Sequence, residues 1–535
     1  MLRVNIVGAG YKPDSTIILP IICFLIYLSC TQFLFAQQNS EYLPINAEAD
    51  AIVYSQDQRS MEASGNVVVT YEDYVITANR LSVDLVQKKA RFSDGFSFMR
   101  NQRAITGREL FYDLEKHEGK AENVTLHMDG MIIKGKTVEI IEEKVILRNS
   151  VITTCDLEHP HYKVTAMDTT LYLKWGLLVS GSSIFWLSDV PVMYIPNYIV
   201  GDPLYGMDTF ENAPLPRIGS DQVNGTYVKE RINTYADEQG SGTAAVEWYE
   251  KNGWLFGFRH DWRYSRTSFG NIRLHYHTVE GLEGGITHRF LLTREKDQRQ
   301  SLNIIEQFFD IVPFDYTPFL EAQFDLTSGE IYNDDRDQQR VSFLPQITLT
   351  IPWQPSLVPQ IDHEMVFQIG NILEEGLADK KNSINRIRSL FSQMYKWSKY
   401  TFWDVNIGLQ SGYTGRWYWN RSGLTDSWNV INGELTLDRI FSPFYARWGY
   451  YHNFINIGSS AFSYDSKEAV VDDEIRYKLS VDLGSNTLAG EWRYNLPQEY
   501  YRDIDVSFKL NIHCWNLVLT WREVRREFNV GVSLN

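Results

Sequence analysis

The sequence predicts an all-β protein in which stacked short strands are followed by an antiparallel transmembrane β-barrel. The first observation behind this prediction is a weak internal repeat between residues 45 and 152. The second is a change to longer segments of alternating apolar and polar residues after about residue 220. The third is composition, since 13 of the 15 Trp lie after residue 205. The two parts of the chain therefore differ in kind.

Charge and hydropathy narrow the class of protein. The net charge is −16, and the acidic residues are spread through the sequence, whereas a nucleic-acid-binding protein shows a basic face or stripe. After the N-terminal region no apolar run approaches the roughly 18–20 residues of a transmembrane helix. We therefore expect no nucleic-acid partner and no transmembrane helix beyond that region.

Residues 1–36 are expected to be a signal peptide. Ile17–Leu28 is an apolar core, preceded by two basic residues and followed by a cleavage position after Ala36. A core of this length is short for a membrane span and suits a cleaved export signal. The alternatives are a retained membrane anchor and a lipid-modified Cys30.

Export changes how the four cysteines are interpreted. Cleavage removes Cys23 and Cys30 and leaves Cys155 and Cys514, which are 514 − 155 = 359 positions apart. In an oxidising compartment such a pair favours a disulfide over a metal site or a nucleophile. That bond would tie the first domain to the last strands of the second.

Residues 37–165 are predicted to form the stacked strands. Related segments start at Ile45, Ile76, Ile105 and Ile133, at intervals of 31, 29 and 28 residues, a period typical of stacked supersecondary units. Apolar and polar residues alternate within each unit, which indicates strands with one face turned inward.

Short polar segments separate these alternating runs. Residues 64–66 (SGN), 93–95 (SDG) and 129–130 (DG) are expected to be turns. The interior between the strand faces is either a closed core or an open groove for an apolar ligand. The edge strands of such a stack are expected to invite pairing with a strand of another protein.

Residues 221–535 are predicted to form the barrel, with 166–220 as the junction and first barrel strands. Segments such as GWLFGFRHDWRY (253–264) alternate, and aromatic residues cluster at strand ends. Strands of about 10 residues with one apolar face and aromatic girdles are the signature of a transmembrane β-barrel, and a soluble β-sandwich is the alternative. The segments suggest about 18 to 22 strands, within an expected range of roughly 18–26. The apolar spacing of 383–397 instead predicts a loop helix.

Catalytic and metal-binding patterns do not stand out, and we expect neither an enzyme, a metal site nor a cofactor. Cys155, His159 and His161 are close in sequence, but a fourth zinc ligand is not evident and a proline interrupts the strand. His275 and His277 share a strand face, which is not a metal site by itself. A G-x-S-x-G nucleophile elbow is absent from the sequence. The acidic loop residues are expected to be solvated or to meet divalent cations at a lipid surface: Asp334, Asp335 and Asp337.

Four segments, in order along the chain, carry a resemblance to one family. They are ASGNVVVTYEDYVITANRLSVDL (63–85), TTCDLEHPHYKV (153–164), DVPVMYIPNYI (189–199) and HCW (513–515). They resemble, respectively, the periplasmic repeats, the junction segment, the proline-rich approach to the barrel and the late cysteine motif of the LPS-assembly outer-membrane (LptD, organic-solvent-tolerance or OstA) family. The resemblance covers nearly the whole mature chain. It implies a periplasmic OstA-type β-jellyroll followed by a barrel in the cell outer membrane.

The resemblance also implies a function, that of an outer-membrane translocon component. Such a protein would receive lipopolysaccharide from a periplasmic OstA-like bridge protein joined edge to edge. It would insert the lipid into the outer leaflet through a laterally opening barrel that holds a plug lipoprotein. Acyl chains would follow an apolar groove, because burying each CH₂ group contributes about 0.8 kcal/mol. The inward positions expected to line this groove are Ile76, Val83, Ile105, Tyr112, Ile133 and Ile140.

Cys155 and Cys514 stand where the family joins its periplasmic domain to a late barrel strand by a disulfide. The sequence departs from the family's best-known pattern because it has one cysteine, not an adjacent pair, near the C-terminus and none at the mature N-terminus. Exchange between alternative disulfides is therefore not expected. The barrel region is also short for this family.

Four prolines surround the start of the predicted barrel. Because proline removes a ladder donor, they would weaken the seam between the first and last strands and help a lateral gate to open. The alternative is that they shape the linker between the domains. These residues are Pro191, Pro196, Pro214 and Pro216.

Two other functions are compatible with parts of the sequence. A porin-like outer-membrane diffusion channel with a periplasmic binding domain would explain the barrel but gives the repeats no clear task. An outer-membrane enzyme would need a catalytic constellation that the sequence does not display.

Overall fold

A computed structural model describes residues 46–534, and Ala47–Asn535 forms one compact unit. The expected signal peptide, 1–36, lies outside the described residues. So do the following residues within the range: 58, 72–73, 101–102, 114–115, 117, 129, 142–143, 173–176, 202–214, 266, 294–317, 334–337, 356–360, 377–382 and 466–472.

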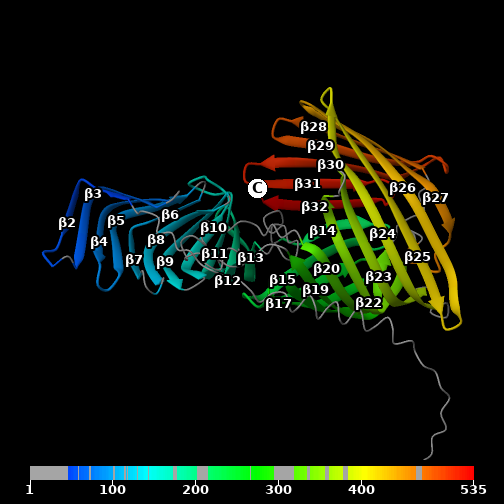
Figure 1. Ribbon diagram of the computed structural model, residues 1–535, viewed down its shortest axis with the longest axis horizontal. Helices are drawn as coiled ribbons and strands as arrows, with labels where there is room; N and C mark the ends of the chain where they lie inside the picture. The colour runs from blue at the N-terminus through cyan, green and yellow to red at the C-terminus, as the bar shows by residue number, and fades with distance from the viewer. Residues whose placement is uncertain are drawn as a thin grey trace, which may run out of the picture. The chain divides into compact units, whose positions relative to one another are not determined.

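The first part of the described chain is a single antiparallel sheet in which strands pair mostly with their neighbours in sequence (Figure 1). The sheet order is β1-β3-β4-β5-β6-β8-β9-β10-β11-β12-β13, with β2 on β3 and β7 on β5 and β8. Its strands are β1 Asn46–Glu48, β2 Ala51–Tyr54, β3 Ser60–Tyr71, β4 Tyr74–Asp84, β5 Lys89–Arg100, β6 Arg103–Gly107, β7 Glu109–Asp113, β8 Glu118–Met128, β9 Met131–Ile141, β10 Lys144–Thr153, β11 Tyr162–Tyr172, β12 Leu177–Leu187 and β13 Val190–Val200.

Alternation along each strand gives this sheet an apolar inner face. In β9, Met131, Ile133 and Val138 are almost completely buried, while Lys134 and Lys136 between them are exposed. Since successive side chains of a strand point to opposite faces, repeating this pattern from β3 to β13 forms one continuous interior.

Two of the expected turns are β-bulges instead. Gly65 and Asn66 have φ of 74° and 45°, and they lie inside β3, where its register with β4 shifts. Asp94 and Gly95 likewise lie inside β5, at the point where this strand changes its partner from β7 to β6. Bulges and turns need the same positive-φ residues, so the sequence signal alone does not separate them.

The sheet extends past the boundary that we placed at residue 165. Strands β11, β12 and β13 continue the ladder to Val200, and the first barrel strand, β14, begins at Arg217. Residues 166–200 therefore belong to the first sheet and not to the barrel. Their pairing with β10 decides this, and the composition of the segment does not reveal it.

The second part is a closed antiparallel barrel, which confirms the predicted fold class (Figure 1). Over the described residues it has 18 strands, because β20 and β21 follow one another along β22. Its strands are β14 Arg217–Asp221, β15 Gly225–Ala236, β16 Gly240–Tyr249, β17 Gly253–Ser265, β18 Ser268–His277, β19 Gly281–Thr293, β20 Pro318–Ser328, β21 Glu330–Asn333, β22 Gln338–Pro355, β23 Ile361–Gly376, β24 Ser383–Phe402, β25 Val405–Asn420, β26 Gly423–Phe441, β27 Phe444–Gly458, β28 Asp473–Leu483, β29 Asn486–Asn495, β30 Tyr500–Ile512, β31 Trp515–Arg522 and β32 Glu527–Leu534.

The loop helix predicted for 383–397 is wrong, because this segment is most of β24. Ile387 is 46 % exposed on the outside, whereas Arg388 and Leu390 line the lumen. An apolar residue on the lumen face next to apolar residues on the outer face produces a spacing close to that of an amphipathic helix. Pairing with β23 and β25 decides for the strand.

No helix in the described part of the chain is long and apolar enough to cross a membrane.

We expect Leu147→Ala to destabilise the first sheet by about 2–5 kcal/mol, because the side chain is fully buried and its removal leaves a cavity. Leu85→Ala is the matched control, since Leu85 is 47 % exposed. Urea titration of the full-length chain in detergent, followed by protease cleavage within β1–β13, measures both. Equal effects of the two substitutions would contradict the buried position of Leu147.

Candidate functional site

The interior of the first sheet is apolar along its whole length and is nearly filled by side chains. Ile133 and Leu147 have no exposed surface, and Leu126 and Val164 are 1 % and 0 % exposed. A cavity of about 40 Å³ opens between β5 and β10, and its lining is almost purely apolar. The residues around it are Phe96, Phe98, Ile105, Leu110, Tyr112, Ala121, Val124, Leu126, Val138, Ile140 and Val145.

The six expected groove residues all belong to this interior. Ile105, Tyr112 and Ile140 line the cavity, and Ile133 is part of the buried core. Ile76 and Val83 are partly buried and pack against the same core. Whether a lipid uses this path stays a prediction, because the interior in this conformation is closed around a narrow cavity.

The apolar interior continues into the barrel at its first and last strands. Cys514 belongs to the same buried cluster, and Leu215, Trp515 and Val532 pack against it. Leu215 lies two residues before β14, whereas Trp515 and Val532 belong to β31 and β32. The interior of the first sheet therefore ends beside the strands that close the barrel.

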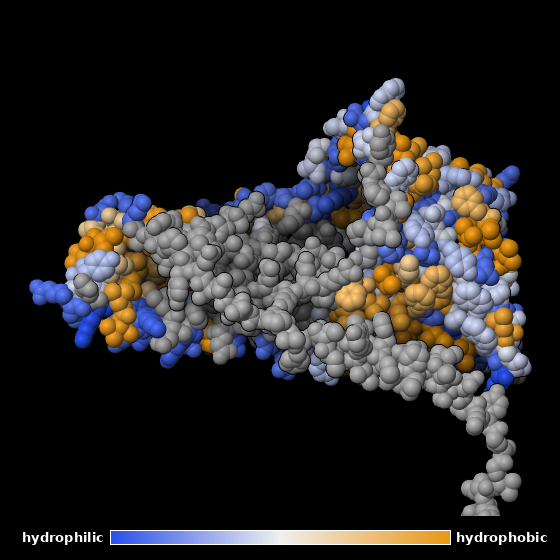
Figure 2. Space-filling model, in the orientation of Figure 1, coloured by the Kyte–Doolittle hydropathy of each residue, from blue (hydrophilic) through white to orange (hydrophobic). Residues whose placement is uncertain are grey.

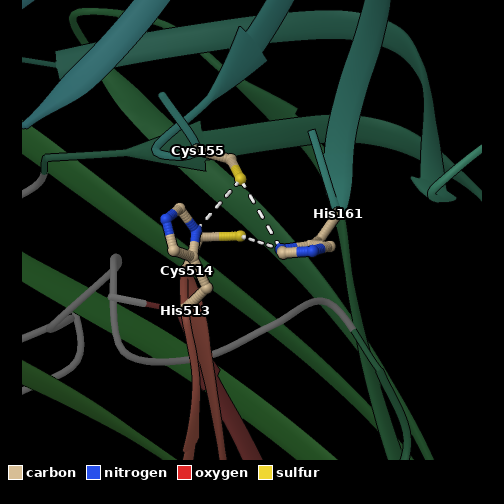
Figure 3. A group of neighbouring side chains, drawn as sticks. All are labelled: Cys155, His161, His513 and Cys514. Carbon is tan, nitrogen blue, oxygen red and sulfur yellow. Dashed lines mark hydrogen bonds between the residues drawn. The ribbon is translucent and has the colours of Figure 1, made fainter. Parts of the chain in front are cut away.

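Four side chains of two segments meet at this junction (Figure 3). Cys155 and His161 flank the connection from β10 to β11, and His513 and Cys514 form the two-residue turn between β30 and β31. The Cys155 Sγ lies 3.8 Å from His161 Nδ1 and 3.6 Å from His513 Nδ1, and Cys514 Sγ lies 3.4 Å from His161 Nδ1. One ligand atom from each residue falls within 4.8 Å of all the others.

Local hydrogen bonds hold these side chains toward one another. The Thr153 hydroxyl accepts the Cys155 backbone N–H at 3.0 Å and donates to the Tyr162 carbonyl at 2.7 Å. His513 has a φ of 56°, which allows it and Cys514 to occupy a tight hairpin turn. Burial, followed by the nearby Cys155 side chain, raises the pKa of the Cys514 thiol to about 12.

Both cysteines are free thiols, and the disulfide stays a prediction. His159, which we considered together with Cys155 and His161, is exposed and does not belong to the cluster. His513 went unnoticed as a chemical residue, although HCW (513–515) was noticed for its cysteine. The only available signal was that a histidine precedes a late cysteine.

The barrel separates an apolar outer face from a polar lumen. Along β17, Trp254, Phe256 and Phe258 are 45 %, 49 % and 47 % exposed on the outside, while Arg259 and Asp261 point inward. Figure 2 shows hydrophobic residues on the visible outer face of the barrel strands. Apolar-out, polar-in alternation is what a membrane-spanning barrel requires.

The lumen contains a cavity of about 790 Å³ whose lining carries more positive than negative charge. Asp325 and Asp465 are its acidic residues. The basic residues that line it are Arg259, Arg273, Arg289, Arg388 and Arg416.

The connection after β27 packs against the inner wall of this lumen. Phe462 is 1 % exposed within an apolar cluster of β22, β23, β25 and β26. Asp465 forms a buried ion pair with Arg388 of β24 and accepts a hydrogen bond from the Tyr418 hydroxyl at 2.9 Å. Glu374 accepts two backbone N–H groups of this connection, at 3.1 and 3.2 Å. Sequence reasoning missed this arrangement, because nothing local distinguishes Asp465 from a solvated loop acid.

The seam that closes the barrel is short. β14 pairs with β32 at three positions only, Ile218↔Val530, Gly219↔Asn529 and Ser220↔Phe528. By comparison, β25 and β26 pair from Asn406 to Asn420. Each missing pair removes ladder hydrogen bonds, so this seam is the weakest point of the wall.

One side-chain hydrogen bond bridges the seam. The Tyr227 hydroxyl of β15 donates to the Asn529 side chain of β32. The bond passes over β14 at Gly219, where a Cβ would collide with both partners. A residue without a side chain is therefore needed at this position of β14.

The four prolines lie at different places. Pro191 and Pro196 belong to β13, the last strand of the first sheet, and Pro191 stands at a register irregularity with β12. Pro216 is exposed immediately before β14, and Pro214 lies outside the described residues. Only Pro216 is therefore next to the seam, and its role as a gate residue stays a prediction.

The remaining candidate residues have no assigned role. His277 is buried, and His275 Nδ1 lies 3.0 Å from Glu283 Oε1 on the neighbouring strand. The acidic residues of the β21–β22 loop lie outside the described residues: Asp334, Asp335 and Asp337.

We expect Tyr227→Phe to loosen the seam, because it removes the hydrogen bond to Asn529 and leaves the ring in place. Amide hydrogen exchange of β14 and β32 in detergent should become several-fold faster, in line with about 0.5–1.5 kcal/mol for one hydrogen bond. Tyr413→Phe is the matched control, because it removes a Tyr–Asn bond (2.8 Å to Asn429) within a long ladder. Unchanged exchange at β14 and β32 would show that this bond does not hold the seam.

Comparison with known proteins gives relatives of one kind. The chain is 20 % identical over 226 residues to the LPS-assembly protein LptD of Pseudoalteromonas atlantica, a match that covers 41 % of this chain and 29 % of the relative. It is 23 % identical over 159 residues to LptD of Haemophilus ducreyi (29 % and 20 % covered). It is 26 % identical over 146 residues to LptD of Neisseria meningitidis (26 % and 18 % covered). The chain thus spans less than a third of the length of the curated relatives it matches. No family model matches.

Solved structures give weaker matches. Outer membrane phospholipase A from Escherichia coli aligns with a TM-score of 0.21 and 15 % identity over 37 % of this chain and 81 % of that one. The translocation pore of the P pilus usher PapC aligns with a TM-score of 0.20 and 8 % identity over 89 % and 94 %. These scores are too low to support an argument about function. The sequence relatives nevertheless agree with each other, and the resemblance of this chain to the LPS-assembly LptD family is confirmed.

Proposed function

We propose that this chain is an outer-membrane translocon component that receives lipopolysaccharide at its first sheet and inserts it into the outer leaflet through the barrel. The observation that carries the proposal is the continuous apolar interior that runs from β3 to β13 and reaches β31 and β32. A lipid following this path would arrive beside the short seam. The proposal assigns the chain no catalytic step.

The receiving end of the path would be the free edge of the first sheet. β2 pairs with β3 on one side only among the described strands. Its residues Val53 and Tyr54 are 63 % and 58 % exposed. An exposed apolar edge strand favours the addition of a strand from another protein. The partner would be a periplasmic bridge protein built from the same OstA-like repeats.

Transport through the first sheet requires that its two faces move apart. The cavity of about 40 Å³ is larger than one water molecule but smaller than an acyl chain. Each CH₂ group that enters it from water gains about 0.8 kcal/mol. An acyl chain of a dozen carbons would therefore offset much of the cost of parting the side chains around Ile105 and Tyr112.

The polar end of the lipid would pass on the lumen side. Its sugars and phosphates are hydrophilic and anionic, and the lumen carries five arginines against two aspartates. Guanidinium groups bind phosphate through paired hydrogen bonds. The acyl chains would stay in the membrane phase and leave between β14 and β32, so the two ends separate at the seam. We propose that a plug lipoprotein occupies the lumen, as the resemblance implies.

A porin-like diffusion channel is the second candidate, and the polar lumen favours it. It gives the apolar interior of the first sheet no task. The two functions differ in what depends on the seam, because diffusion of a solute through the lumen needs no lateral opening.

A photoreactive residue at Ile105 or Tyr112 should form an adduct with lipopolysaccharide in living cells. Both side chains line the apolar cavity, and the adduct should depend on cellular energy. The control is the same residue at Phe111, which follows Leu110 on the outer face of β7 and is 47 % exposed. Adducts at Phe111 but not at the two cavity positions would mean that the interior is a closed core.

Locking the seam should stop the delivery of lipopolysaccharide to the cell surface. Cysteines at the paired positions Ser220 and Phe528 would cross-link β14 to β32 on oxidation. We expect oxidised cells to become sensitive to large hydrophobic antibiotics, and a reductant to restore the barrier. The control pair replaces Ser392 and Thr414, whose hydroxyl oxygens lie 3.0 Å apart between β24 and β25. A locked seam with an intact barrier would favour the channel.

A further inference from the structure

We propose that Cys155, His161, His513 and Cys514 bind one zinc ion, which fastens the first sheet to the barrel. This site is independent of the transported lipid and therefore does not rest on the proposed function. It would take the place of the predicted disulfide between the two cysteines.

The first argument is geometric. Zinc in a structural site binds thiolate sulfur at about 2.3 Å and imidazole nitrogen at about 2.0–2.1 Å, in a tetrahedron. These bond lengths place a sulfur and a nitrogen ligand about 3.6 Å apart. The three sulfur–nitrogen distances in the cluster are 3.4, 3.6 and 3.8 Å. The four atoms therefore already stand where the corners of such a tetrahedron would lie (Figure 3).

The second argument is the identity and orientation of the ligand atoms. Both histidines turn Nδ1 toward the sulfurs. The other nitrogen of His513, Nε2, lies 3.4 Å from the Asp156 carboxylate. A carboxylate behind a histidine fixes the ring and is the usual partner of a metal-binding imidazole.

The third argument is charge and burial. Cys155 and Cys514 are 1 % and 3 % exposed, so an isolated thiolate there would be costly. Zinc binding releases one proton from each thiol, and two thiolates with one Zn²⁺ and two neutral imidazoles have no net charge. A disulfide would use the two sulfurs only and would leave His161 and His513 facing it without a bond to make there.

The position of the site gives it a purpose. His513 and Cys514 belong to the turn that precedes β31, and β31 contacts the interior of the first sheet through Trp515. A metal at this turn would hold the end of the apolar interior against the last barrel strands. Unlike a disulfide, such a link forms and breaks without an oxidant or a reductant.

The test is the metal and thiol content of the full-length protein, extracted from membranes in detergent without added metal, chelator or reductant. We expect one zinc per chain by mass spectrometry of the elements. We also expect two thiols that react only after denaturation with a chelator. A Cys155–Cys514 disulfide found by peptide mapping, with no zinc, would overturn the proposal.

Single substitutions identify the ligands. His161→Ala and His513→Ala should each weaken zinc binding by more than about tenfold, because each removes one ligand. His159→Ala is the matched control, since His159 lies on the same connection but is exposed and outside the cluster. Zinc retained equally by all three variants would show that the metal sits elsewhere.

Cobalt provides a readout that does not depend on folding yield. Co²⁺ added to the chelator-treated, reduced protein should give the sulfur-to-metal absorption and the intense visible bands of a tetrahedral thiolate site. Cys514→Ser should weaken the charge-transfer absorption by about half, because one of two sulfurs is lost. The absence of these bands in the unsubstituted protein would contradict a Cys₂His₂ site.

Discussion

Closure of the barrel is the constraint on which the rest of the molecule depends. In a hydrocarbon environment every backbone N–H and C=O group needs a partner within the protein, so a membrane-spanning sheet has to close on itself. Here β14 and β32 achieve closure with three residue pairs. The Tyr227–Asn529 hydrogen bond adds a side-chain bridge across the same place. The wall is therefore continuous, but its weakest ladder is at the seam.

The junction gives this weak ladder its significance. The buried cluster of the first sheet extends to Trp515 and Val532, which belong to the last two strands of the barrel. An apolar path and a weak seam thus meet at one point. The Cys155, His161, His513 and Cys514 cluster lies at the same junction, and a metal there would keep the path aligned with the seam while β14 and β32 separate.

Local patterns were sufficient where a single strand carries the information. The alternation in 253–264 places Trp254 and Phe256 outside and Arg259 inside, because side-chain direction in a strand has a period of two. The repeat starting at Ile76, Ile105 and Ile133 likewise identified the inward face of the first sheet. Local patterns failed at 64–66, where a bulge replaced the expected turn, and at 383–397, where lumen-facing Leu390 imitated a helical period.

The sequence by itself determined the fold class, the order of the two parts and the inward positions, since all three follow from the short-range alternation of polar and apolar residues. The tertiary structure decided what depends on distant partners. Only strand pairing carries the first sheet to Val200. Only the fold brings His513 and Cys514 to Cys155, across more than 350 positions of chain. The length of the seam was also a tertiary outcome, because the pairing of β14 with β32 is fixed when the barrel closes and not by either strand alone.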